Sequence, residues 1–244
     1  MEYLRRLCGS LLVTVLLWPT ALVAQTETVA LRGARLLTIT QGEIENGVVV
    51  ISNGRIAAVG SNASIPSGAR VLDVSGKTVL PGMIDGFTNL GLVDYPSYGE
   101  DDDEGTTPVT PQMRVVDGLN PANRFFELAA NSGVTAALCA PAEGNLFTGQ
   151  SALIHTHGST LEEMVIGAPM GVHVTLGEPP KLRYGPKNTQ PMTRMGAAAL
   201  LRQTLIQAQE YAAKLERYES EQASWDEERE NDAPTPPERD LKLE

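Results

Sequence analysis

Residues 76–92 of the chain read GKTVLPGMIDGFTNLGL, and the character of the sequence changes within this stretch. Before it, short runs rich in β-branched residues are separated by glycine, asparagine and serine. After it, apolar runs alternate with segments of helical pattern. Residues 79–85 are short and mostly apolar, which predicts a buried strand. The stretch therefore joins a small β-unit, residues 25–79, to an α/β region, residues 80–215.

A hairpin is predicted inside the β-unit. Apolar residues alternate on both sides of Asn53 and Gly54, in GVVVISNGRIAAV. An Asn-Gly pair between such runs favours a two-residue turn, because both residues must adopt a positive φ. We therefore expect an antiparallel unit, which at this size buries little core of its own.

The α/β region opens with a predicted helix and strand. In NPANRFFELAANSG, Asn120 is the expected N-cap, Pro121 the first helical residue and Gly133 the residue beyond the helix end. The apolar run at 134–140 is typical of a parallel strand that is covered on both faces. A βαβ order of this kind predicts a parallel sheet.

Further along, Ser159 and Glu162 fit a capping box that begins a short helix, LEEMVI. GVHVTLG, residues 171–177, is the next expected strand of the same parallel sheet.

A long helix is predicted from about Met195. Apolar residues at spacings of four and three form one stripe, which favours packing against a sheet over a coiled coil; they are Leu201, Leu205, Ala208, Ala212 and Leu215. Residues 216–244 are acidic and rich in proline, so we expect a solvated linker or tail there.

The amino terminus has the pattern of a secretory signal. Arg5 and Arg6 precede an apolar run, and a small residue, Ala24, precedes Gln25. A membrane anchor is the alternative, but Pro19 and nearby polar residues leave the run too short to span a bilayer well. We expect cleavage after residue 24, export to the periplasm or the medium, and no stable membrane anchor.

Charge and cysteine content exclude some classes of function. The formal charge is −11, which disfavours nucleic acid as a partner. Cys8 lies in the expected signal, and Cys139 lies in the apolar run VTAALCAP. A small buried side chain is the favoured interpretation of Cys139, and no disulfide framework is expected.

The motif PGMIDGFTN resembles the junction at which a small β-domain meets strand one of the barrel in the amidohydrolase superfamily, especially in exported relatives of imidazolonepropionase. The similarity continues in order through TPVTPQMRVVDGLNP, ANSGVTAAL, GQSALI, EEMVIGAPMGVHVTLGEPPK and TRMGAAALLRQ. The resemblance implies an α/β fold with a small, incomplete β-sandwich unit followed by an incomplete (β/α)8 TIM-type barrel. It also implies zinc or another divalent metal and hydrolysis of non-peptide carbon–nitrogen bonds.

One motif of the family is replaced. The family carries an H-x-H pair at the end of strand one, and those positions are Phe87 and Asn89 here. A phenyl ring offers no lone pair, and a neutral amide is a poor substitute for imidazole on zinc. The later ligands of the family have no counterpart in this sequence, in which we find about three of the eight strands that a closed barrel needs. We therefore expect a fragment, truncated or split, with no bound cofactor, no assignable catalytic residue and no activity.

Two histidines are a weaker metal candidate. His155 and His157 form an H-x-H on an expected strand, but no third ligand lies near in sequence. His173 is expected to be a packed strand residue. The acidic run 100–104 lacks the spacing of a calcium loop and is expected to be solvated, although a substrate-facing role stays open. Arg114 and Arg194 are expected in structural ion pairs, with anion binding as the alternative.

These observations leave two main hypotheses of different kinds, and a third, weaker one, a periplasmic metal-binding module built on His155 and His157. The first is the amino-terminal portion of an amidohydrolase whose small-molecule substrates would be cyclic amides or imines. The second is a non-catalytic paralogue, a pseudoenzyme that acts as a binding or partner module, as a homo-oligomer or beside an active relative.

Overall fold

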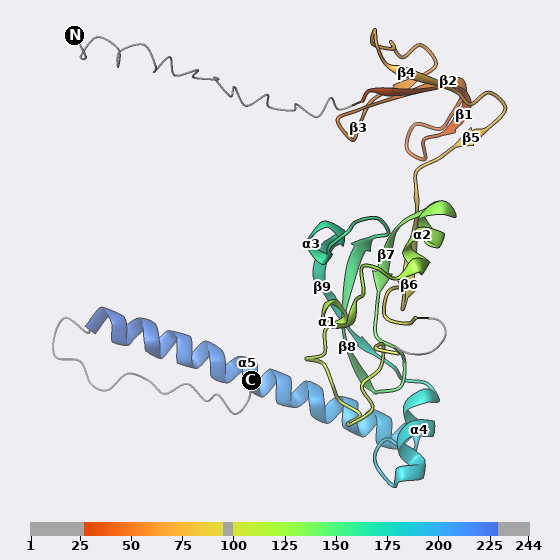
Figure 1. Ribbon diagram of the computed structural model, residues 1–244. Coiled ribbons are helices and arrows are strands. Elements are labelled where there is room, and N and C mark those ends of the chain that lie inside the picture. Colours follow the sequence, from red (N-terminus) through yellow and green to blue (C-terminus); the bar gives the residue numbers. More distant parts are fainter. Residues whose placement is uncertain (1–26, 95–99, 229–244) are drawn as a thin grey trace, which may run out of the picture. The chain divides into compact units, whose positions relative to one another are not determined.

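The computed structural model describes residues 27–94 and 100–228, so the expected signal peptide and the end of the acidic tail lie outside the described residues. The chain divides into two compact units, the first ending at Pro81 and the second beginning at Gly82 (Figure 1). This division lies two residues beyond the predicted end of the β-unit.

The first unit is one mixed sheet in the order β3-β2-β1-β4, with β5 also paired to β1. Its strands are β1 Val29–Leu37, β2 Glu43–Ser52, β3 Arg55–Gly60, β4 Arg70–Asp73 and β5 Thr78–Val79. The expectation of a purely antiparallel unit was wrong, because β4 and β5 both pair with β1 in parallel. The described residues form one sheet, so the expected β-sandwich is not established.

The predicted hairpin is confirmed. β2 and β3 pair antiparallel, with Ser52 opposite Arg55. The two residues between them, Asn53 and Gly54, have φ values of +54° and +69°. Such a turn matches the twist of the flanking strands, and this conformation is the reason for an Asn-Gly pair here.

Apolar side chains occupy both faces of this sheet. Ala30, Val48 and Val50 form a cluster on one face, against which Ala63 and Ile65 of the following loop pack. Val49 and Leu36 belong to a second cluster on the other face. Because neighbouring residues of β2 point to opposite faces, the run of valines at 48–50 supplies both clusters.

The second unit is built on a sheet in the order β6-β7-β8-β9. Its strands are β6 Met83–Thr88, β7 Val134–Cys139, β8 Phe147–His155 and β9 Val165–Val174. Only β6 and β7 pair in parallel, while β8 pairs antiparallel with both β7 and β9. The expectation that residues 171–177 add a parallel-paired strand was therefore wrong, and the barrel is present only in part.

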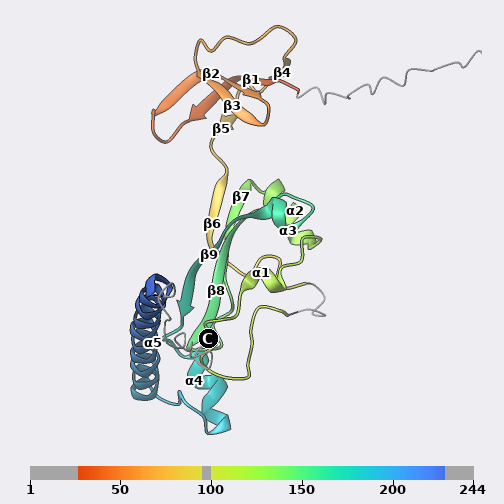
Figure 2. The same cartoon turned by 90° about the vertical axis from the view of Figure 1, so that its left-hand side faces the viewer.

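Three short helices cover one face of the second sheet (Figure 2). They are α1 Val115–Gly118, α2 Arg124–Asn131 and α3 Leu161–Met164. Phe126 of α2 and Met164 of α3 join Ala137, Cys139 and Ile154 of the strands in the main core of the unit. The buried positions alternate along β7 as they must when only one face of a strand meets helices.

Helix α2 begins three residues later than predicted. Its N-cap is Asn123, whose Oδ1 accepts from the backbone N–H of Phe125 at 2.9 Å. Asn120 instead accepts from the N–H of Ala122, in a turn that precedes the helix. Gly133, with φ +89°, follows the helix end as expected.

The cap of α3 is also shifted, by one residue. Thr160, not Ser159, is the N-cap, and its hydroxyl accepts from the N–H of Glu163 at 3.4 Å. Glu163 in turn accepts from the N–H of Ser159 at 2.8 Å. The two reciprocal bonds satisfy backbone donors that the helix leaves free.

After β9 the chain forms α4 Pro179–Tyr184, a 3-10 turn Gly185–Lys187 and α5 Arg194–Glu228. Residues 216–228 therefore continue this helix, and most of the side chains at 216–226 are exposed. Ala197, Leu200 and Leu201, in the first turns of α5, pack with Leu146 and Phe147. Alanine, leucine, glutamate and arginine are strong helix formers, which explains why the acidic residues continue the helix.

Among the described helices, none combines the length and hydropathy that a crossing of the bilayer requires.

The cap of α2 yields a first test. Asn123 is buried, and its Nδ2 also donates to the carbonyl of Val93 at 2.8 Å. We expect Asn123→Ala to lower the free energy of unfolding of the second unit by about 2 kcal/mol, because a cap and a buried bond are both lost. Asn120→Ala is the matched control and should cost less than about 1 kcal/mol. Urea unfolding followed by circular dichroism measures both, and equal losses would contradict the assignment of Asn123 as the cap.

Candidate functional site

The carboxyl ends of β6 and β7 lie at the same edge of the second sheet, because the two strands are parallel and α2 connects them. The register shifts between Asp85 and Thr88, where three steps along β6 correspond to two along β7. Such an irregularity re-aims side chains and is common beside active sites. Phe87 is the next-to-last residue of β6 and therefore lies beside the loop that follows the strand.

Phe87 contacts a residue from the far strand of the sheet. Its ring centroid lies 5.5 Å from that of His173, with the ring planes inclined by 56°. β6 and β9 are the outer strands, with β7 and β8 between them. Because neighbouring strands are about 4.8 Å apart, residues of β6 and β9 meet only when their side chains converge over a shared face of the sheet. Burial lowers the pKa of His173, which leaves its imidazole neutral at pH 7.

Asn89 makes a different contact, with the acidic loop. Its Nδ2 donates to Oδ2 of Asp102 at 3.0 Å. On the other side of Phe87, Oδ1 of Asp85 accepts from the N–H of Phe87 at 3.2 Å. The polar groups next to Phe87 are thus engaged in bonds within the chain.

These residues do not fit the divalent metal that the resemblance implies. Phe87 has no donor atom, and Asn89, whose Nδ2 bonds to Asp102, could offer only one neutral amide oxygen, a poor substitute for imidazole on zinc. Burial raises the pKa of Cys139 to about 12, and its Sγ donates to the carbonyl of Leu90 at 3.1 Å, so it is a thiol and not a thiolate ligand. Within the described ranges, no three His, Cys, Asp or Glu side chains are grouped so that they could hold a metal ion.

His155 and His157 lie at the opposite end of the sheet. His155 pairs with Ala136 near the start of β7, whereas Thr88 pairs with Cys139 at its end. Both histidines are exposed, and Thr156 between them is buried. The structure thus keeps this pair apart from Phe87, Asn89 and His173.

The acidic run 100–104 is only partly solvated, because residues 102–104 are half-buried. Asp103 forms an ion pair with Arg183 of α4, and only 14% of its side chain is exposed. Burial raises the pKa of Asp103, although the guanidinium of Arg183 opposes the shift. The run lines a cavity of about 580 Å³ together with Arg114 and Asp117.

Arg114 has the structural role that was expected of it. Its guanidinium donates to both carboxylate oxygens of Asp117, at 2.7 and 2.9 Å. Arg194 is exposed at the start of α5, and its charge adds to that of Lys181 in lowering the pKa of Glu178.

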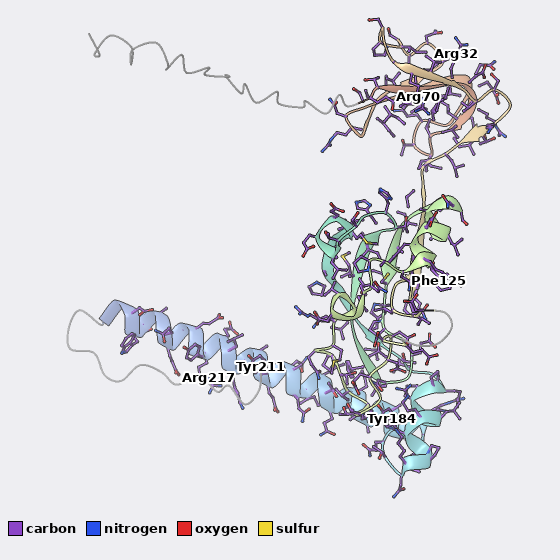
Figure 3. All side chains as sticks on the ribbon, viewed as in Figure 1. Arg32, Arg70, Phe125, Tyr184, Tyr211 and Arg217 are labelled. Carbon is purple, nitrogen blue, oxygen red and sulfur yellow. The ribbon has the colours of Figure 1, made fainter. Side chains whose placement is uncertain are left out.

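A buried polar network holds α4 against this loop. The hydroxyl of Tyr184 (labelled in Figure 3) donates to Oδ1 of Asn145 at 2.5 Å. Nδ2 of Asn145 donates to the carbonyl of Glu104 at 2.5 Å and to the hydroxyl of Thr110 at 2.9 Å. Sequence reasoning missed this network, because its members come from three distant segments. The one available signal was Gly144, where a Cβ would collide with Asp103 and Arg183.

A second, smaller cavity of about 290 Å³ lies beside the rings of Phe87 and His173. Phe87, Pro141 and Leu176 form apolar parts of its wall, and His173 and Glu143 are polar parts. The cavity is concave and mixed in polarity, as sites for small molecules are. This arrangement can bind a small ligand.

Comparison with known proteins gives consistent matches, although no protein-family model matches the chain. An amidohydrolase from Hapsidospora irregularis is 27% identical over 166 residues, which cover 62% of this chain and 17% of that protein. The imidazolonepropionase of Klebsiella pneumoniae is 38% identical over 73 residues, 28% of this chain and 18% of the relative.

The solved structure of an amidohydrolase from Thermotoga maritima is 30% identical, with a TM-score of 0.74, over 88% of this chain and 53% of that chain. The chain thus spans about half the length of this structure and less than a fifth of the two curated relatives.

The buried network provides a test of stability. Tyr184→Phe removes the donor to Asn145 and leaves a buried amide oxygen unpaired, so we expect a loss of about 1–3 kcal/mol in the free energy of unfolding. Tyr218→Phe is the control, because the hydroxyl of Tyr218 meets Gln222 on a partly exposed side of α5. A loss for Tyr184→Phe no larger than that of the control would contradict the network.

The thiol of Cys139 provides a test of burial. In a Cys8→Ser chain, Cys139 is the one cysteine left, and its pKa of about 12 predicts negligible labelling by a disulfide reagent at pH 8. In urea the pKa returns to about 8.5 and labelling should become rapid. Fast labelling of the native chain at pH 8 would show that the thiol is accessible.

Proposed function

The matches support a place for this chain in the amidohydrolase superfamily, and we propose that its parent activity is hydrolysis of non-peptide carbon–nitrogen bonds in cyclic amides or imines. The chain's similarity to an imidazolonepropionase favours this substrate class. The order of the motifs along the sequence and the parallel β6-α2-β7 unit support the same relation.

We further propose that this chain does not itself perform the metal-dependent reaction. The observation that carries this proposal is the end of β6, where Phe87 packs on His173 and Asn89 bonds to Asp102. Hydrolysis of this type needs a cation that activates water and polarises a carbonyl. An aromatic ring has no lone pair for that cation, and a single neutral amide oxygen is a poor substitute for imidazole.

In the same proposal, the chain is exported and acts as a non-catalytic binding or partner module. Two features favour this role over a purely vestigial one. A cavity of about 290 Å³ remains beside Phe87. In addition, apolar side chains of β6 and β9 are exposed, among them Ile84 at 69% and Met170 at 52%. Exposed apolar groups of this size are typical of surfaces that meet another molecule.

Metal content tests the proposal directly. The purified chain, its Phe87→His/Asn89→His double variant and a control with Arg55→His/Ala57→His on β3 are dialysed against zinc and analysed by inductively coupled plasma mass spectrometry. The control places an H-x-H on exposed positions of another strand. We expect substoichiometric zinc in the unmodified chain.

The double variant should bind zinc about tenfold more tightly than the control, because His173 lies within reach as a third imidazole. One zinc per unmodified chain that is lost in an Asn89→Ala variant would contradict the proposal.

A further inference from the structure

The side chains that line the cavity beside Phe87 favour a positively charged ligand over a negatively charged one. Of its described lining residues, Glu143 is the one carboxylate, and none is lysine or arginine. Burial lowers the pKa of His173, which disfavours its cationic form. The remaining wall is apolar or hydroxylic, with Pro141, Leu176 and Thr148 among its members. An anion would therefore meet no cationic partner, whereas a cation would meet a carboxylate.

Aromatic surface reinforces this preference. Phe87 is 51% exposed and lies with His173 on the wall of the cavity. The face of an aromatic ring attracts cations through its quadrupole, and the attraction is strongest for organic cations that lose water easily. A neutral imidazole next to the ring does not oppose such a ligand.

The neighbouring cavity adds a field of the same sign. Pro141 and Thr148 line both cavities, so the two border one another. The larger one carries the acidic run 100–104 and Asp117. Arg114 pairs with Asp117 and Arg183 with Asp103, and the summed charge of these groups remains negative. A cleft with one sign of charge raises the local concentration of oppositely charged ligands.

From these three observations we propose that the cavity bounded by Phe87, His173 and Glu143 binds a small organic cation with an apolar or aromatic body. The ammonium or guanidinium group lies next to the carboxylate of Glu143, and the apolar body lies against Phe87. This inference rests on the proposed function only in requiring that no metal occupies the space beside Phe87.

The test compares three ligands of one size on the full chain, by isothermal titration calorimetry at low salt with a chelator present. They are benzylamine, benzyl alcohol and benzoate, which are cationic, neutral and anionic. We expect benzylamine to bind about threefold to fivefold more tightly than benzyl alcohol, the range expected for an exposed ion pair, and benzoate not to bind. Equal binding of benzoate, or no binding of benzylamine, would overturn the inference.

Variants locate the site. Glu143→Gln should remove the advantage of benzylamine over benzyl alcohol, whereas Glu210→Gln, on the exposed surface of α5, should preserve it. Phe87→Leu keeps an apolar side chain but should weaken benzylamine about threefold, because the aromatic face is lost. An unchanged preference in Glu143→Gln would overturn the inference. Since the chelator removes metal, such a failure is distinct from the finding of bound zinc, which would overturn the proposed function.

Discussion

The parallel pairing of β6 with β7 is the constraint on which the rest of the second unit depends. It requires a crossover, which α2 supplies, and it brings the carboxyl ends of both strands to one edge of the sheet. Phe87 and Pro141 therefore line the same cavity although they are far apart in sequence. β8 pairs with the side of β7 that β6 leaves free, and it runs antiparallel to β7. β9 is antiparallel to β8 and so runs in the same direction as β6, which brings His173 to the same edge as Phe87.

The chemistry at this edge follows from what the side chains contact. The ring of Phe87 packs against that of His173. The Nδ2 of Asn89 donates a hydrogen bond to Asp102, and the thiol of Cys139 donates one to the carbonyl of Leu90. Phe87 offers no lone pair to a cation, and among the residues that the structure describes no three His, Cys, Asp or Glu side chains are grouped to hold one. The same residues leave a concave, partly aromatic surface with one carboxylate, and that surface suits a ligand held by charge and contact area.

Local signals in the sequence predicted the elements better than their pairing. The Asn53-Gly54 turn could be read from two residues, because positive φ depends on those residues alone. The direction of β9 could not, since an apolar strand has the same pattern in parallel and antiparallel pairs. The contact of Phe87 with His173, and the network around Asn145, join segments that only tertiary packing brings together. The cap of α2 was misplaced because Asn120 and Asn123 are both good capping residues.

The most direct test of the central claim is a nuclear Overhauser measurement on a chain labelled at phenylalanine and histidine. If the ring of Phe87 occupies the space beside His173, the two rings give a cross-peak that one equivalent of zinc leaves unchanged. If zinc instead shifts the His173 signals stoichiometrically and removes the cross-peak, the end of β6 holds a cation and the account is contradicted.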